Sequence, residues 1–254
     1  MSGRLHNLGT YGTMMVSCGK KKSGRELKKL VFDLLSRKDH KKAFVAFSML
    51  PSGQLINTLF SFLYHADEFI RWRAINTMGS IVNEIADKDM EKARVIMRRL
   101  MWNLNDESGG IGWGSPEAMG EILARHKGLA EEYGNIFISY ARKDGNYLEH
   151  EMLQRDLLRG FGRLSKVRPE LLKEAIPHLM LYLESADSGV RGLAAWVMGL
   201  LKKEESRPYL EKLTGDGAEL MIPSRNEMIK TSVKDLAGEA LEKLNGLIPN
   251  RERK

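Results

Sequence analysis

A glycine-rich stretch holds the residues best suited to ligand recognition. Between Asn105 and Ile122 the chain reads NDESGGIGWGSPEAMGEI, and its glycines are Gly109, Gly110, Gly112 and Gly114. A helix is expected to begin with Ser115 as its N-cap, because serine caps helices well and proline fits the first helical turn. A glycine loop at a helix N-terminus offers backbone N–H groups to an anion, and Trp113 offers an aromatic ring. We therefore predict a recognition loop over Gly109–Gly114. The alternative is that Trp113 packs inward as part of the core.

Basic side chains form a second candidate site. Arg155, Arg159 and Arg163 follow one another at i, i+4 and i+8, which places them on one face of a helix. Such a row is either a solvated face or a cationic trough for an acidic protein segment or a phosphate backbone. We adopt the trough, and the arginines expected to contact the partner are Arg71, Arg155, Arg159 and Arg191.

Residues that could hold a metal ion are dispersed. The six histidines fall in different predicted elements, and His150-Glu151 is the only adjacent His-Glu pair. One pair of this kind cannot form a metal site, so neither a metal nor a cofactor is expected. The single cysteine, Cys18, excludes an internal disulfide and suits the reducing cytoplasm, which is the predicted location.

Composition and charge restrict the class of protein. The chain has 254 residues, of which 43% are hydrophobic and 29% charged, as in globular proteins, and its net charge is +7. Part of the basic excess lies in residues 1–23, expected to form a flexible leader, and in residues 247–254, expected to form a tail. No stretch approaches the roughly 20 apolar residues that span a bilayer, so membrane insertion is not expected.

An internal repeat predicts the elements that position these residues. Apolar residues, with one glycine, recur at offsets of 4, 5, 8 and 11 from four anchors: Ile70, Leu153, Val190 and Val233. A fifth copy is anchored at Ile111, and there serine and proline replace the apolar residues at offsets 4 and 5. The pattern is one stripe of a helix written five times at spacings of 37 to 43 residues. Four copies carry a glycine at offset 9, which predicts close approach between helices: Gly79, Gly120, Gly162 and Gly199.

The repeat predicts an all-α fold. Further helical segments lie between the five copies, so each repeat is a hairpin of two helices that must stack on its neighbours to bury its apolar stripe. We expect a single right-handed α-solenoid over residues 24–246, with five hairpins behind an N-terminal helical pair. The stretch from Leu213 to Glu227 contains Gly, Asp and Pro, and is expected to be a loop that interrupts the last hairpin.

The repeats resemble HEAT repeats of the type shared with phycobilin lyases. In that pattern an acidic residue is followed by Val-Arg, then Ala, then a hydrophobic-Gly pair. The residues that match are Asp187, Val190, Arg191, Ala194 and Gly199, and again Asp67, Ile70, Arg71, Ala74 and Gly79. Deoxyhypusine hydroxylases are similar in fold and bind iron through His-Glu pairs just after the Val-Arg position. In this chain the residue just after the Val-Arg position is Trp, Trp, Arg and Gly in four of the copies. The His-Glu pairs are therefore missing, and deoxyhypusine hydroxylase activity is rejected.

These observations favour a non-catalytic scaffold or adaptor that recognises an acidic protein through its concave face and the Gly109–Gly114 loop. The alternative is a DNA-binding protein or an enzyme that resembles alkylpurine DNA glycosylases, which are also built from HEAT-like repeats. Those enzymes carry a Trp and an Asp four residues apart, and Trp102 and Asp106 have this spacing. In that resemblance Asp106 would stabilise positive charge on the sugar.

Overall fold

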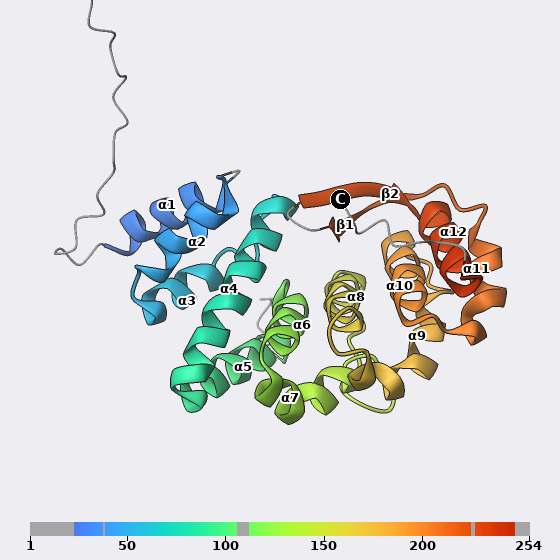
Figure 1. The fold of residues 1–254 in the computed structure, drawn as a ribbon, viewed down its shortest axis with the longest axis horizontal. Coiled ribbons are helices and arrows are strands. Elements are labelled where there is room, and N and C mark those ends of the chain that lie inside the picture. The colour runs from blue at the N-terminus through green and yellow to red at the C-terminus, as the bar shows by residue number, and fades with distance from the viewer. Residues whose placement is uncertain (1–22, 38, 106–111, 225–226, 247–254) are drawn as a thin grey trace, which may run out of the picture.

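The computed structural model describes residues 23–37, 39–105, 112–224 and 227–246. Helices dominate it, and they form a curved arc of two layers (Figure 1). The inner layer consists of the five predicted second helices: α4 (Glu68–Lys88), α6 (Ser115–Arg125), α8 (Glu151–Ser165), α10 (Ser188–Leu201) and α12 (Val233–Leu244). Each of these helices packs against the next in chain order. The chain is therefore an α-solenoid, as the repeat predicts.

The outer layer is built from the first helix of each hairpin. These helices are α3 (Ser52–Phe60), α5 (Met90–Leu104), α7 (Lys127–Ser139), α9 (Ile176–Tyr182) and α11 (Arg207–Leu213). The 3-10 helices η1 (Pro169–Ala175) and η2 (Glu204–Ser206) precede the last two of them, and α1 (Gly24–Leu35) and α2 (His40–Ser48) precede the first hairpin. No single helix of the described ranges is long and apolar enough to cross a membrane; only the α2–α3 pair, bent by 119°, meets that requirement together.

The apolar stripe is largely buried, with exceptions in the last two copies. In the copies anchored at Ile70 and Leu153, every residue at the four offsets is buried, and in the Ile111 copy Met119 and Ile122 are buried. In the copy anchored at Val190, Ala194, Ala195 and Met198 are buried and Leu201 is half-buried. In α12 the residues Leu241 and Leu244 are only half-buried. The stripe is thus confirmed, and it weakens at α12 because no further repeat follows in the described chain.

The offset-9 glycines lie at equivalent contacts between inner helices. A Cβ atom at Gly79 would lie 2.6 Å from Glu121 Cγ, and one at Gly120 would lie 2.4 Å from Gly160 Cα. Likewise, Gly162 faces the ring of Trp196 and Gly199 faces Ala240. Each glycine therefore makes room for the inner helix of the next repeat, which confirms the prediction of close approach.

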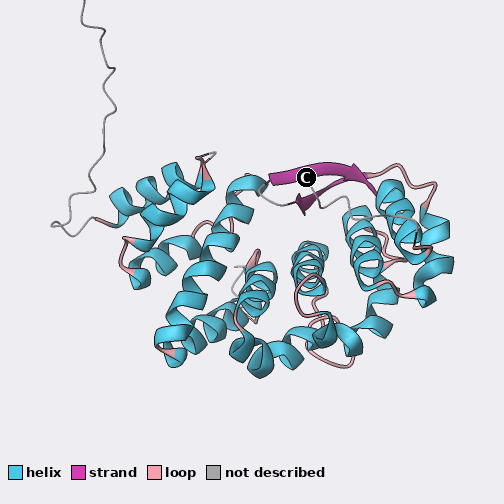
Figure 2. Ribbon diagram, viewed as in Figure 1, coloured by secondary structure: helices cyan, strands magenta, loops and turns pink. Residues whose placement is uncertain are grey.

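The prediction of a loop between Leu213 and Glu227 is correct only for residues 214–218 and is wrong for Glu219–Ser224. Residues Glu219–Ser224 form strand β1, which pairs with β2 (Glu227–Ser232) as an antiparallel hairpin (Figure 2). Its register joins Glu219 to Ser232 and Ser224 to Glu227. Proline is tolerated at Pro223 because a two-stranded sheet has only edge strands.

The hairpin extends from the last repeat across the open side of the arc toward the start of α4 (Figure 1). Arg159 of α8 links the two segments, because its Nη2 donates to Glu68 of α4 at 3.1 Å and to the Met221 carbonyl of β1 at 3.4 Å. At its base, Leu220 packs beside Gly192 of α10, where an added Cβ would lie 2.9 Å from the leucine.

Candidate binding site on the concave face

A cavity of about 440 Å³ lies on the concave side of the inner helices. Trp72, Ile75 and Asn76 line it from α4, and Trp196 lines it from α10. Pro223 of the hairpin forms part of its wall, so the β-hairpin helps to enclose it. The remaining lining residues come from α6, from α8 and from the C-cap of α8, and they are Glu117, Glu121, Arg125, Arg159, Gly162, Arg163 and Lys166.

One position of the repeat supplies a row of these lining residues. Six residues after the anchors of four successive copies stand Asn76, Glu117, Arg159 and Trp196. Because equivalent positions of stacked helices face the same way, this offset runs along the concave wall. The spacing of these four residues is visible in the sequence, but their types differ from copy to copy, so the position does not stand out as a repeated site. Of the four, only Arg159 was predicted to contact a partner.

The cavity wall carries more positive than negative charge. Four basic side chains line it against two carboxylates, Glu117 and Glu121. Buried Glu121 accepts from Arg125 Nε at 2.5 Å and from Arg163 Nε at 2.8 Å, using a different oxygen for each. The Lys166 ammonium lies 5.4 Å from the centre of the Trp196 ring, within range of a cation–π contact. This end of the cavity therefore combines cations with an aromatic surface.

Beneath this surface lies a buried network of charged groups. Arg159 is buried, and its guanidinium lies 3.9 Å from Glu117 and 3.7 Å from Asp156 as well as against Glu68. Removal from water raises the pKa of Glu117 to about 7, although attraction to Arg159 opposes the shift. Burial also raises the pKa of Asp156.

The described part of the glycine loop is tied to this network. Gly114 has a φ of 76° and is the N-cap of α6, so the predicted cap at Ser115 is wrong by one residue. Its N–H donates to Asp156 Oδ2 at 2.6 Å. The anion that the helix N-terminus receives in this structure is thus a carboxylate of α8.

Packing accounts for two of the loop glycines. A Cβ atom at Gly112 would lie 2.7 Å from the Asn103 carbonyl oxygen, and one at Gly114 would lie 2.9 Å from the Leu63 carbonyl oxygen. Trp113 is half-buried against the hydrophobic core and does not line the cavity. Gly109 and Gly110 lie outside the described residues, so a recognition role for the whole loop stays a prediction.

The four arginines predicted to contact a partner are engaged with carboxylates of the chain itself. Arg71 and Arg159 are buried and both bond Glu68, at 3.2 and 3.1 Å. Of the four, only Arg159 lines the cavity.

The other two bond acidic residues at the turns before the next elements. Arg155 bonds Asp187, the N-cap of α10, at 2.8 and 2.5 Å, and Arg191 bonds Asp216 at 2.6 Å. Both pairs hold the pKa of the aspartate below its usual range, through the hydrogen bond from the guanidinium. Partner binding by these arginines stays a prediction.

Of the two residues of the glycosylase alternative, Trp102 is not brought to the cavity. Trp102 lies on outer-layer helix α5 and is 74% exposed, and Asp106 lies outside the described residues. His150 is the N-cap of α8, where Nδ1 accepts from the Met152 N–H at 3.1 Å. Arg125, Lys166 and Pro223 of the cavity wall were not predicted, because nothing in the linear pattern indicates that they meet.

No family model matches the chain. A protein of Archaeoglobus fulgidus described as uncharacterized is 26% identical over 189 residues, which cover 72% of this chain and 94% of that protein. Among solved structures, an engineered protein matches with a TM-score of 0.50 at 15% identity, covering 87% of this chain and 99% of that one. A computationally designed armadillo repeat protein for modular peptide recognition gives a TM-score of 0.45 at 19% identity, covering 86% and 100%. The chain is a helical repeat protein, and these likenesses concern its fold alone.

Proposed function

We propose that this protein is a non-catalytic scaffold that binds an acidic segment of another protein in the cavity on its concave face. The observation that carries this proposal is the composition of the cavity wall, where Arg125, Arg163, Lys166 and two tryptophans stand against Glu121. The other two charged lining residues, Arg159 and Glu117, belong to the buried network and offset each other. Opposite charge guides association, and a tryptophan surface adds apolar contact area. The volume of about 440 Å³ admits a few side chains of an extended segment but not a folded domain.

The proposed scaffold comprises the repeats from residue 24 to residue 246 acting as one domain, of the phycobilin lyase-like HEAT type. Its supports are the Asp-Val-Arg-Ala-Gly pattern and the N-caps that the pattern predicts. Asp67 accepts from the backbone of Phe69, and Asp187 accepts from the backbone of Val190, both at 2.8 Å. We propose a cytoplasmic location, because a chain with a single cysteine cannot form an internal disulfide and suits a reducing compartment.

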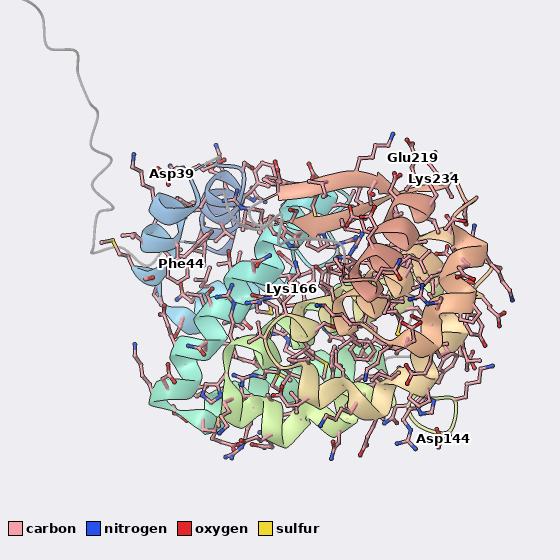
Figure 3. The ribbon with its side chains drawn as sticks, turned by 45° about the vertical axis from the view of Figure 1, so that its right-hand side comes forward. Asp39, Phe44, Asp144, Lys166, Glu219 and Lys234 are labelled. Carbon is pink, nitrogen blue, oxygen red and sulfur yellow. The ribbon has the colours of Figure 1, made fainter. Side chains whose placement is uncertain are left out.

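The test uses fluorescence anisotropy with dye-labelled peptides, one rich in Asp and Glu and one rich in Lys. We expect the native chain to bind the acidic peptide and Lys166→Glu to weaken that binding by about tenfold, because the substitution reverses a charge on the cavity wall. The matched control is Lys143→Glu, an exposed lysine beside Asp144. Figure 3 shows Asp144 at the edge of the molecule, far from the central position of Lys166.

Two results would count against the proposal. Equal weakening by Lys166→Glu and Lys143→Glu would mean that the acidic peptide responds only to the net charge of +7. Binding of a short DNA duplex in preference to the acidic peptide, lost on Trp102→Ala, would favour the nucleic-acid alternative instead.

A further inference from the structure

We propose that Arg125 and Arg163 form a recognition site for a phosphate monoester carried by the bound segment. This inference rests on the proposed function, because it names the chemical group that the cavity reads. It begins with buried Glu121, whose two oxygens each accept from the Nε of one arginine, at 2.5 and 2.8 Å. One carboxylate therefore orients two guanidinium groups side by side. Gly79 of α4 leaves space for Glu121 and Arg125, since a Cβ there would lie 2.6 Å from Glu121 Cγ and 3.2 Å from Arg125 Nε.

Both guanidiniums keep donors for a ligand. The side chains of Arg125 and Arg163 are 31% and 36% exposed, and both line the cavity. Within the described ranges, both arginines donate hydrogen bonds through Nε, and their Nη groups donate none. Each guanidinium presents its Nη N–H groups in a planar fork, the geometry that fits two oxygens of a phosphate or carboxylate.

Charge distinguishes the phosphate from a single carboxylate. Arg159 is offset by the carboxylates packed around it, Glu117 among them, so the charges that face a ligand are Arg125, Arg163 and Lys166 against Glu121, an excess of two positive charges. A phosphate monoester carries about −1.5 to −2 at neutral pH and has three strong acceptor oxygens, whereas a carboxylate carries −1 and has two. A phosphate therefore matches the excess more closely and can accept from both arginines at once. Trp196, beside Lys166, offers an apolar surface to the group that bears the phosphate.

The same chemistry has two sources, a phosphorylated side chain of the partner and a small-molecule phosphate. Isothermal titration calorimetry on the full chain separates them with three probes: an acidic peptide with one phosphoserine, the same peptide with glutamate at that position, and phenyl phosphate. We expect the phosphopeptide to bind about tenfold more tightly than the glutamate peptide, through charge-assisted bidentate hydrogen bonds.

The variants are Arg163→Gln and Arg125→Gln, and the control is Arg94→Gln. Arg94 of α5 also donates from Nε to a glutamate, Glu132, at 2.9 Å, and its side chain is 37% exposed, but it does not line the cavity. Each cavity variant should remove the preference for phosphoserine, while the control keeps the affinity within about twofold. Arg163→Lys keeps the positive charge but lacks the planar pair of Nη groups. It replaces Arg163→Gln in the experiment if circular dichroism shows that Arg163→Gln is unfolded.

The outcomes decide between the two proposals. Equal affinity for phosphoserine and glutamate peptides would overturn the phosphate inference and leave the acidic-segment proposal intact. Binding of phenyl phosphate alone, lost in Arg163→Gln, would support a small-molecule phosphate site and overturn the protein partner. Binding of none of the three probes, or a phosphoserine preference that survives both cavity variants, would overturn this site.

Discussion

Glu117 is an acid held among charges inside the molecule. Its neighbours are Arg159 and Asp156 of α8, Arg71 of α4 and Glu121 of its own helix. Its pKa rises from 4.5 to about 7 in the folded state, mainly through loss of hydration. Between these values the folded chain binds more protons than the unfolded chain, so the free energy of unfolding falls as pH rises. This contribution is fully present below the unfolded pKa and lost above the folded one.

The corresponding prediction concerns Glu117→Gln, which cannot ionise. Relative to this variant, the native chain should lose free energy of unfolding as the pH rises from about 5 to about 8. Urea titrations of both proteins across this range measure the difference. A difference that stays constant with pH would show that Glu117 does not titrate in this window.

Asp156 positions the start of α6 through the Gly114 N–H. Asp156→Ala should lower the free energy of unfolding by about 1–3 kcal/mol, because a buried donor loses its acceptor. Asp156→Asn retains an amide oxygen at that place and avoids burying a charge, so its loss should be smaller. Chemical denaturation of the three proteins tests this order, and equal losses for both variants would contradict it.

At the scale of helices, the repeated glycines have different surroundings and therefore different predicted effects. Gly120→Ala places a Cβ against the backbone of Gly160 and should cost about 1–3 kcal/mol through overpacking of α6 on α8. Gly238→Ala, in α12, meets no atom within 4 Å and should instead stabilise by about 0.5–1 kcal/mol. Thermal melts should move in opposite directions, and a shared direction would contradict the packing role assigned to Gly120.

The apolar stripe of α8 allows a simple test of the repeat. Leu157 is fully buried, and Leu157→Ala should cost about 2–5 kcal/mol as a core truncation. Half-exposed Phe44 of α2, seen near the periphery in Figure 3, serves as the control, and its change to Ala should cost clearly less. Similar losses in urea titrations would mean that the stripe had been assigned to the wrong face.

Periodicity made the inner helices predictable, because the residues at each offset pack against the same neighbours in every repeat. The β-hairpin was not predictable in this way, since it breaks the period and its strands pair only with each other. The N-cap of α6 was predicted one residue too late, at Ser115, because serine is a common N-cap residue. In the structure Gly114, with its positive φ, takes that position.

The candidate site was less predictable than the fold. The sequence placed Arg155 and Arg159 on one helix, but it could not show that Asp187 and Glu68 neutralise them. Arg125 was not predicted as a site residue, because it lies beside Arg163 only when the repeats stack and both arginines bond Glu121. Pairing between elements decides which basic groups remain for a ligand, and that information is absent from spacing along the chain.

At the scale of the whole molecule, we expect the β-hairpin to restrict the access of solutes to the cavity. Replacement of Glu219–Ser232 by two glycines is feasible because the Val233 N–H already bonds the Ala218 carbonyl at 2.9 Å. We expect the solenoid to remain folded with a lower melting temperature, since buried Ile222 contributes only about 1.5–3 kcal/mol. The tryptophans of the cavity wall should become more accessible to acrylamide.

Fluorescence quenching in a Trp102→Phe background measures this change, because Trp102 is already 74% exposed. Unchanged quenching would show that the hairpin does not restrict access, and a chain that loses its helical circular dichroism would show that it is needed for folding.

An open solenoid behaves thermodynamically as a linear array, in which each repeat depends on its immediate neighbours and the end units fray first. The contacts of Arg159 with Glu68 and Met221 add a link between segments far apart along the chain. Opening the last repeat would therefore remove the Met221 carbonyl from the same guanidinium that bonds Glu68 at the start of α4, so fraying at one end is expected to weaken a contact near the other. Amides of α4 and α12 should consequently exchange their hydrogens in one cooperative unit rather than in a gradient along the arc.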